Sequence, residues 1–417
     1  MTNQRASGRC WLFASTNVFR VALMRRYGLE SFELSQAYLF FWDKLEKANY
    51  FLENIIDTAA AGEDLDGRLV QRLLADPVSD GGQWDMVFNL VDKYGLVPHD
   101  LYPDSWSAAA SSTLNYIVVA KLRGYALKLR ALVADPRTTT AALSAAKARM
   151  LREIHLVLVL TLGPPPSPED EFVWEFTDAK GRARTVRSTP RAFARDISSP
   201  GFRVSFDDPG AGSSIAGHVS LVNDPRHPPL TRLAVDRLGN IVGGRGVTYV
   251  NVDMTTLKAA CVAMLRAGIP VFFGSDVGKF SDSASGVMDL DLVDYELGFN
   301  VDLYGAGLDK AARLRVGESA MTHAMVLTAV HVEDGGEDGE KGRARGRGSE
   351  KTVRWRVQNS WGEAAGHKGW FVMTDRWMDE FVYQAVVDPR FLTREVRDVL
   401  EKDPVVLPLW DPMGALA

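Results

Sequence analysis

The sequence predicts an α+β protein with a helical lobe first and a sheet lobe later. Apolar residues recur at helical spacing through the first hundred residues, and three apolar stretches after residue 320 have the composition of strands. At 417 residues, the chain is long enough for two to three domains or for one domain with a large insertion. We expect four segments: a helical lobe (1–125), an inserted helical and mixed region (126–300), a sheet lobe (301–400) and a C-terminal tail (401–417).

Helices and strands are assigned from the spacing of apolar residues and from residues that begin or end an element. Ser35 is a typical N-cap, Gly28 and Gly95 are typical helix ends, and Gly163 with three following prolines halts the last long helical stretch before the strands. The expected helices cover residues 10–26, 36–52, 83–94, 129–162 and 255–267. The expected strands cover residues 172–176, 219–222, 247–252, 271–274, 325–332, 353–357 and 370–373, the last three as neighbours in an antiparallel sheet.

The composition excludes several classes of protein. Lys and Arg number 48 and Asp and Glu number 53, and this net charge of −5 argues against a dedicated nucleic-acid or membrane-surface binder. There are two cysteines, Cys10 and Cys261, so we expect no disulfide framework and a reducing compartment. The longest apolar run, 154–162, is too short for a membrane span, and the polar residues 1–9 do not form a signal peptide. We therefore expect a soluble, cytoplasmic protein without membrane partners.

Residues 333–351 are rich in glycine and in charge, with six acidic and five basic side chains. A nearly neutral run of this kind predicts a solvated loop inserted between two strands. A basic arm that binds nucleic acid is the alternative.

Cys10 is the first candidate for a catalytic side chain, because it begins a predicted helix. Exposed amide groups and the helix dipole stabilise an anion there, and they can lower a thiol pKa from about 8.5 to roughly 3.5–7.5. Gln4 lies six residues before the thiol, so its amide could join the Cys10 N–H in holding an oxyanion. Gly8 lets the chain turn tightly between them. For Cys10 taken alone, a buried structural thiol is the alternative.

A thiol nucleophile also needs a base and a group that orients the base. Among seven histidines, His323 is the best candidate because it enters a strongly apolar strand; a satisfied core histidine is the alternative. Asn359 follows 36 residues later, and its amide oxygen could accept a hydrogen bond from the imidazole while Trp361 shields that bond from water. We expect neither a metal nor a cofactor.

These motifs resemble those of the papain-like cysteine peptidases. The resemblance rests on Gln4, on the run from Ser7 to Trp11, on the His323 strand and on the run Asn-Ser-Trp-Gly that begins at Asn359. The run Asp-Gly-Gly-Gln-Trp at 80–84 is similar to the glycine-lined substrate wall of that fold, which implies that Gly81 and Gly82, together with Trp361, contact the substrate. In typical papains the histidine lies about 130–150 residues after the cysteine. The longer interval here implies a large insertion.

Over nearly its whole length the sequence resembles the bleomycin hydrolase family of these peptidases. The most specific matches are residues 221–226, 276–279 and 317–319 and the terminal run 410–417. The resemblance implies a two-lobe papain-like fold, with a helical lobe, an antiparallel sheet or barrel lobe, a large insertion and a C-terminal tail in the active-site cleft. It also implies a cytosolic cysteine aminopeptidase that assembles as a homohexameric ring and acts on peptides, on the bleomycin amide and on homocysteine thiolactone. In that family pattern, the terminal carboxylate, here of Ala417, pairs with the α-ammonium group of the substrate.

Nine residues precede Cys10, whereas the family usually carries several tens. Compared with the family, the sequence is therefore a shortened gene model or isoform, or it is a chain that lacks the segment. The lack of the segment would affect both the stability of the fold and the formation of the hexamer. A missing upstream segment would also allow a mitochondrial pool. Two further hypotheses are an inactive homologue and a ring scaffold with weak nucleic-acid binding.

Overall fold

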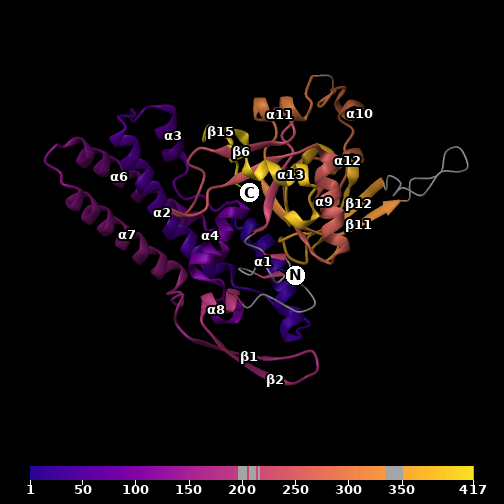
Figure 1. The fold of residues 1–417 in the computed structure, drawn as a ribbon, viewed down its shortest axis with the longest axis horizontal. Helices are drawn as coiled ribbons and strands as arrows, with labels where there is room; N and C mark the ends of the chain where they lie inside the picture. Colours follow the sequence, from indigo (N-terminus) through magenta and orange to yellow (C-terminus); the bar gives the residue numbers. More distant parts are fainter. Residues whose placement is uncertain (196–203, 206–212, 215–216, 306, 334–350, 417) are drawn as a thin grey trace, which may run out of the picture.

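A group of helices and a large mixed sheet pack together along helix α1 (Figure 1). The computed structural model describes residues 1–195, 204–205, 213–214, 217–305, 307–333 and 351–416. The described helices are α1 (Cys10–Tyr27), α2 (Gln36–Ala60), α3 (Arg68–Ala75), α4 (Trp84–Tyr94), α5 (Trp106–Ala109), α6 (Ser112–Ala134), α7 (Thr140–Leu162), α8 (Pro190–Arg195), α9 (Met254–Arg266), α10 (Tyr295–Phe299), α11 (Lys310–Val316), α12 (Asp375–Phe381) and α13 (Arg394–Asp398).

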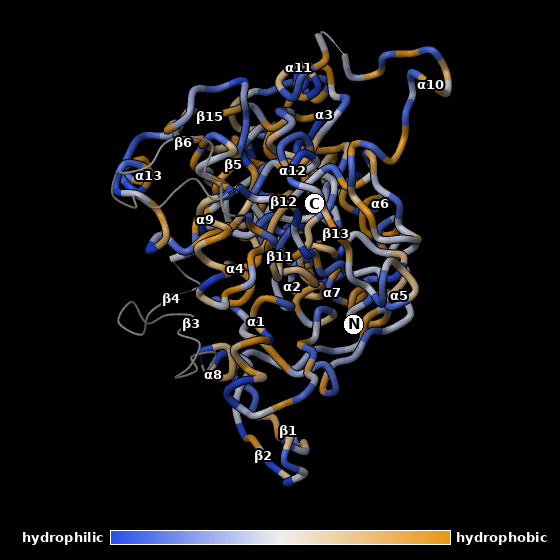
Figure 2. The backbone as a smooth tube through the Cα atoms, turned by 90° about the vertical axis from the view of Figure 1, so that its right-hand side faces the viewer, coloured by the Kyte–Doolittle hydropathy of each residue, from blue (hydrophilic) through white to orange (hydrophobic). Residues whose placement is uncertain are grey.

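The described strands lie from residue 172 onward. They are β1 (Phe172–Thr177), β2 (Ala183–Ser188), β3 (Val204–Ser205), β4 (Ser213–Ser214), β5 (Val219–Val222), β6 (Thr231–Val235), β7 (Thr248–Asn251), β8 (Val271–Ser275), β9 (Ser281–Asp282), β10 (Val287–Met288), β11 (His323–Glu333), β12 (Lys351–Gln358), β13 (Trp370–Thr374), β14 (Val382–Val387) and β15 (Val405–Leu407). Eleven of them form one sheet in the order β15-β6-β7-β5-β14-β8-β11-β12-β13-β10-β9. Strands β1 and β2 form a hairpin that extends away from the body (Figures 1 and 2).

The three late strands β11, β12 and β13 are antiparallel neighbours, which confirms the prediction for that part of the sheet. The sheet as a whole is mixed rather than antiparallel, because β5–β7, β6–β15 and β10–β13 are parallel pairs. The chain passes through β6 between β5 and β7, so these two strands run in the same direction. The sequence pattern of single strands carries no information about these crossovers.

Helix α1 is buried on nearly all sides. It contacts α2 and α4 on one side and β8 and β11 on the other, so its apolar residues are not confined to one stripe. Apolar segments gather in the interior of the molecule, as the hydropathy colouring shows (Figure 2). The helix ends at Gly28 in the left-handed conformation, with φ 66°, where the sequence predicts its end. This arrangement brings the first turn of α1 to the junction between the helices and the sheet.

The single helix predicted over residues 129–162 is wrong. Two helices, α6 and α7, pack against each other and against α2 in this region (Figure 1). The break falls at Asp135 and Pro136, because a proline disfavours helical geometry in the residue before it. The predicted boundary at residue 125 lies within α6, and β8, from the predicted insertion, pairs with β11 of the predicted sheet lobe. The division into four segments stays a prediction.

Two further expectations concern surfaces and loops. Residues 334–350 of the predicted charged loop lie outside the described residues. Within the described part of the chain, none of the helices combines the length and the apolar character that a bilayer crossing requires.

His218 is expected to make the stability of the fold depend on pH. Its side chain is buried and stacks on Trp84, with ring centroids 5.9 Å apart. Burial lowers the pKa of His218 to about 4, although the carboxylate of Asp388 opposes this shift. The unfolded chain, with an ordinary histidine pKa near 6.5, therefore binds more protons between pH 6.5 and 4, and the stability falls as the pH is lowered through that range.

Because of His218, we expect the free energy of unfolding to be about 2 kcal/mol lower at pH 5 than at pH 7. The measurement is urea unfolding at the two pH values. His218→Phe should reduce that difference, whereas replacement of the exposed His331 by Gln should leave it unchanged. Equal pH dependence in the parent and in His218→Phe would contradict the assignment.

Candidate active site

Helix α1 begins at Cys10, and the chain before it is held in place. The Arg9 guanidinium is buried, donates to the two carboxylate oxygens of Asp104 at 2.8 and 2.7 Å, and lies over the rings of Phe13 and Phe40. The Gly8 N–H donates to the carboxylate of Asp80 at 3.1 Å. Cys10 itself is 3% exposed. The helix therefore presents its first side chain from a fixed entry.

His323 begins strand β11 and meets Asn359 just after strand β12. His323 Nε2 and Asn359 Oδ1 are 2.8 Å apart, and both residues are buried. The Trp361 ring lies beside the imidazole, with ring centroids 4.9 Å apart, so it limits access of water to that bond. Because Asn359 occupies Nε2, Nδ1 is the nitrogen that remains for a second partner.

The start of α1 lies against the start of β11. The backbone amide of Ala324, next to His323, lowers the pKa of the Cys10 thiol, and α1 and β11 are in contact. The structure thus brings Cys10 next to the strand that His323 begins, and it brings His323 to Asn359, although the three residues are far apart in the sequence.

The electrostatics of this group differ from the expectation for Cys10 alone. Burial raises the pKa of the Cys10 thiol to about 11, although the amides of Ala324, Trp11 and Cys10 itself lower it. The helix N-terminus therefore does not by itself favour a thiolate here, because loss of water outweighs the amide groups. Burial also lowers the pKa of His323 to about 4, against the bond to Asn359. Burial therefore favours the neutral form of each of the two groups.

Gln4 lies in an N-terminal segment that pairs with the chain after Asn359. The Gln4 N–H donates to the Ser360 carbonyl at 2.8 Å, and Asn3 and Trp361 form an antiparallel bridge. Gln4 Oε1 accepts from Ser360 Oγ at 2.6 Å, and Gln4 Nε2 donates to the Ser7 carbonyl at 2.8 Å. One N–H of this amide remains beyond the bond to Ser7, and it is the group that could bind an oxyanion.

Gly82 lies against the residue that follows the thiol. A Cβ on Gly82 would come within 2.5 Å of the Trp11 ring, so only glycine allows this close approach. The Trp11 indole donates to the Asp80 carbonyl at 2.6 Å. Gly82, one of the two glycines of the predicted wall, is therefore packed against the start of α1.

The C-terminal tail folds back over the body of the molecule, and its end lies within the outline in both views (Figures 1 and 2). Strand β15 pairs with β6, the Tyr249 hydroxyl donates to the Met413 carbonyl at 3.0 Å, and Arg226 pairs with Asp411 at 2.7 Å. Gln83 Nε2 donates to the Ala415 carbonyl at 2.7 Å, which ties the tail to the segment that carries Gly81 and Gly82. Ala417 lies outside the described residues.

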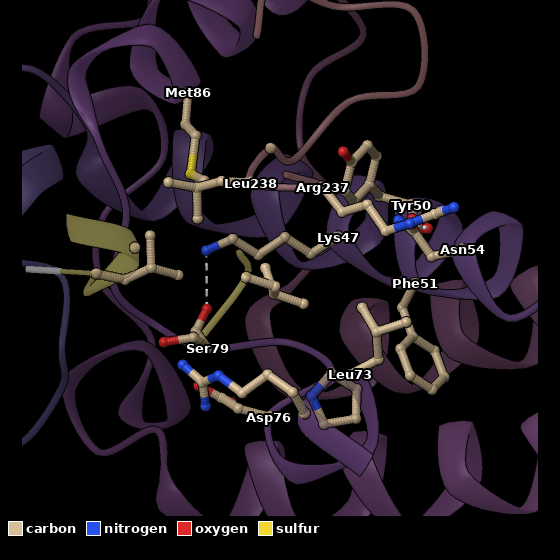
Figure 3. Close-up of a pocket in the computed structure, with 16 residues that line it drawn as sticks. Lys47, Tyr50, Phe51, Asn54, Leu73, Asp76, Ser79, Met86, Arg237 and Leu238 are labelled. Atoms are coloured by element: carbon tan, nitrogen blue, oxygen red, sulfur yellow. Dashed lines mark hydrogen bonds between the residues drawn. The ribbon is translucent and has the colours of Figure 1, made fainter. Parts of the chain in front are cut away.

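A small cavity of about 90 Å³ lies between helix α2 and the tail (Figure 3). Lys47 and Tyr50 of α2 line one side, and Gly414 and Leu416 of the tail line the other. Lys47 extends across this cavity toward Ser79 (Figure 3). The tail thus approaches both the glycine wall and α2.

Sequence reasoning assigned no role to Gln83, Asp80, Lys44 or Lys47. A signal for the two lysines exists: Lys44 follows Phe40 by four residues and Lys47 precedes Phe51 by four, so both lie on the apolar stripe of α2. A charged residue at such a position needs a buried partner. For Gln83 no sequence pattern predicts a bond to a residue more than three hundred positions away.

Comparison with known proteins identifies the family. The model of the Peptidase C1-like family matches residues 1–414. Bleomycin hydrolase from Homo sapiens and from Gallus gallus is 43% identical over 420 residues, which covers all of this chain and 86% of each relative. Cysteine proteinase 1, mitochondrial, from Saccharomyces cerevisiae is 43% identical and is covered over 81% of its length.

A solved structure agrees with these relatives. PepW from Lactobacillus rhamnosis HN001 superimposes with a TM-score of 0.89 at 42% identity, over all of this chain and 86% of that one. Fold and sequence therefore point to the same family, and they confirm the predicted α+β papain-like architecture. This chain belongs to the Peptidase C1-like family and is a cysteine peptidase of the bleomycin hydrolase type.

Proposed function

We propose that this peptidase is an aminopeptidase in which Cys10 is the nucleophile, His323 the acid and base, and Asn359 the residue that orients the imidazole. One observation supports it above the others: His323 is bonded through Nε2 to Asn359, and it begins the strand that contacts α1, whose first residue is Cys10. Proton transfer from the thiol to Nδ1 gives a thiolate and an imidazolium that compensate each other.

The thiolate sulfur then forms a bond to the carbonyl carbon of the first residue of a peptide. The carbonyl oxygen becomes an oxyanion, which the Cys10 N–H and the remaining Gln4 N–H stabilise. The imidazolium protonates the leaving amine as the C–N bond breaks, and an acyl-enzyme remains. Neutral His323 next takes a proton from water, whose oxygen attacks the thioester and releases the product and the thiol.

The tail supports specificity for the first residue. Gln83, which follows Gly82, holds the Ala415 carbonyl, and Tyr249 holds the Met413 carbonyl. A tail held in this way would block a longer chain on that side. The terminal carboxylate of Ala417 would pair with the α-ammonium group of the substrate. The bleomycin amide and homocysteine thiolactone fit the same pattern, because each has a free amine next to the carbonyl that is attacked.

The preference for a free amine tests the proposal. Hydrolysis of a fluorogenic aminoacyl amide should be at least about 100-fold faster than hydrolysis of its N-acetylated form, because acetylation removes the charge that the tail carboxylate binds. The measurement is kcat/KM for the two substrates. Equal values of kcat/KM for the two substrates would contradict the proposed aminopeptidase activity, although the protein would still be a cysteine peptidase.

Three finer expectations stay predictions. They are the cytoplasmic location, the homohexamer and weak binding of nucleic acid. Size measurement in solution tests the hexamer, and salt-dependent retention on DNA tests nucleic-acid binding.

A further inference from the structure

Helix α2 places two buried lysines against residues 78–81. Lys44 Nζ donates to the Val78 carbonyl at 2.6 Å and lies 2.6 Å from a carboxylate oxygen of Asp80. Lys47 Nζ donates to the carbonyls of Ser79 at 2.9 Å and of Gly81 at 2.6 Å, and it lies 2.7 Å from the carboxylate of Asp43. Lys44 is 0% exposed and Lys47 is 5% exposed. Because burial of an unpaired ammonium group is strongly unfavourable, these bonds hold the segment onto α2.

Asp80 connects this segment to the chain around Cys10. Its carboxylate accepts from the Gly8 N–H, two residues before the thiol, and its carbonyl accepts from the indole of Trp11, one residue after it. Ser111 and Asn115 also donate to the carboxylate, Asn115 at 2.8 Å. A Cβ on Gly8 would come within 2.8 Å of the Asp80 Cβ, so the two chains are in close contact. Asp80 therefore holds the backbone on both sides of Cys10.

We propose that Lys44 and Asp80 are positioning residues for the thiol: Lys44 fixes Asp80, and Asp80 fixes the two ends of the segment that carries Cys10. Lys47 contributes to the same unit, because its ammonium group lies 5.1 Å from the Trp11 ring centroid and also holds Gly81. This inference rests on the proposed role of Cys10 as the nucleophile.

The same pair sets the charge near the sulfur. Burial is the main cause of the raised pKa of Cys10, and the Asp80 carboxylate adds to it. The Lys44 ammonium, in contact with that carboxylate, compensates its charge. The charged and titratable groups packed around this unit are Lys44, Lys47 and Asp43 of α2, Asp80, the Arg9–Asp104 pair and His323.

The pH dependence of Cys10 alkylation tests the proposal. The rate with iodoacetamide, followed by mass analysis of the Cys10 peptide, reports the fraction of thiolate. In Lys44→Met, Asp80 keeps three neutral donors and stays ionised, so the midpoint should rise by about 0.5–1 pH unit. In Asp80→Asn the midpoint should fall, and in the double variant it should return toward the parent value. In both single variants kcat/KM for an aminoacyl amide should fall about tenfold or more, because the thiol is no longer held in place.

Lys93→Met is the matched control. It removes the same charge from a lysine that pairs with Glu46 of α2 at 2.6 Å rather than with residues 78–81, so its midpoint should equal that of the parent. Folding of each variant is checked by its melting temperature. If Lys44→Met does not fold, Asp80→Asn is compared with Asn115→Ala, which loosens Asp80 without removing a charge. A midpoint that is lower in Asp80→Asn than in Asn115→Ala supports the role of the charge, and equal midpoints contradict it.

Unmoved midpoints in folded variants, or shifts of both single variants in the same direction, would overturn the positioning role. That failure is distinct from failure of the proposed function. A protein that stays active after its Cys10 is alkylated would refute the nucleophile assignment itself.

Discussion

Replacement of Cys10 by Ala is expected to lower the turnover of a fluorogenic aminoacyl amide by about 10⁴-fold or more. The reason is that no other group in the site can form the acyl intermediate: the proposed oxyanion donors and the substrate contacts remain, but the sulfur that attacks the carbonyl is gone. The measurement is kcat at saturating substrate, with KM expected to change little because substrate binding does not depend on the thiol.

Cys261 supplies the matched control for this variant. It is the second cysteine of the chain, it is fully buried within α9, and burial raises its pKa to about 12. Cys261→Ala should keep the parent kcat at a temperature where the protein is folded. A Cys10→Ala protein that retains the parent turnover, or a Cys261→Ala protein that loses it while folded, would refute the assignment of the nucleophile.

Deletion of residues 414–417 is expected to convert the proposed aminopeptidase activity into endopeptidase activity. Loss of the charge-assisted bond to the substrate ammonium should lower kcat/KM for an aminoacyl amide about 10- to 100-fold. The space that the tail occupied should then accept a longer peptide, so that an N-acetylated peptide is cleaved at internal bonds. Mass analysis of the products from such a blocked peptide is the measurement.

A milder variant distinguishes the position of the tail from its presence. Gln83→Leu keeps every residue of the tail but removes the bond to the Ala415 carbonyl, so it should give an intermediate loss of the preference for a free amine. The shortened protein should keep the anchors at Asp411 and Met413. If the full-length and the shortened protein cleave the N-acetylated peptide in the same pattern, the proposed role of the tail in specificity is wrong.

The elements that end with clear local signals could be predicted from the sequence. Ser35 accepts a hydrogen bond from the Tyr38 N–H at the start of α2, and Gly95 ends α4, as their residue types indicate. The error at residues 129–162 arose because alanine-rich helical period continues on both sides of Pro136, and the periodicity outweighed the proline. Local composition therefore predicts where helices form better than where they divide.

The residues proposed for catalysis could be selected because each stands in a motif with a chemical reason. The proposed positioning unit could not be selected from the sequence, because Lys44 and Asp80 come into contact only when α2 packs against residues 78–81. The raised pKa of Cys10 is likewise a property of packing, since burial against β11 outweighs the helix terminus. Contacts between distant segments decide these properties, and no local pattern encodes them.

Strand β15 is short, and its three residues form the outer edge of the large sheet beside β6. Without β15, the longer strand β6 would form this edge and would expose a row of unpaired N–H and C=O groups, which attract a strand from another molecule. Residues 405–407 therefore also protect the protein from aggregation, independently of any contact with substrate. Shortening of the tail is safe for solubility only downstream of this strand, and a deletion that reaches it would confuse a loss of specificity with a loss of folded protein.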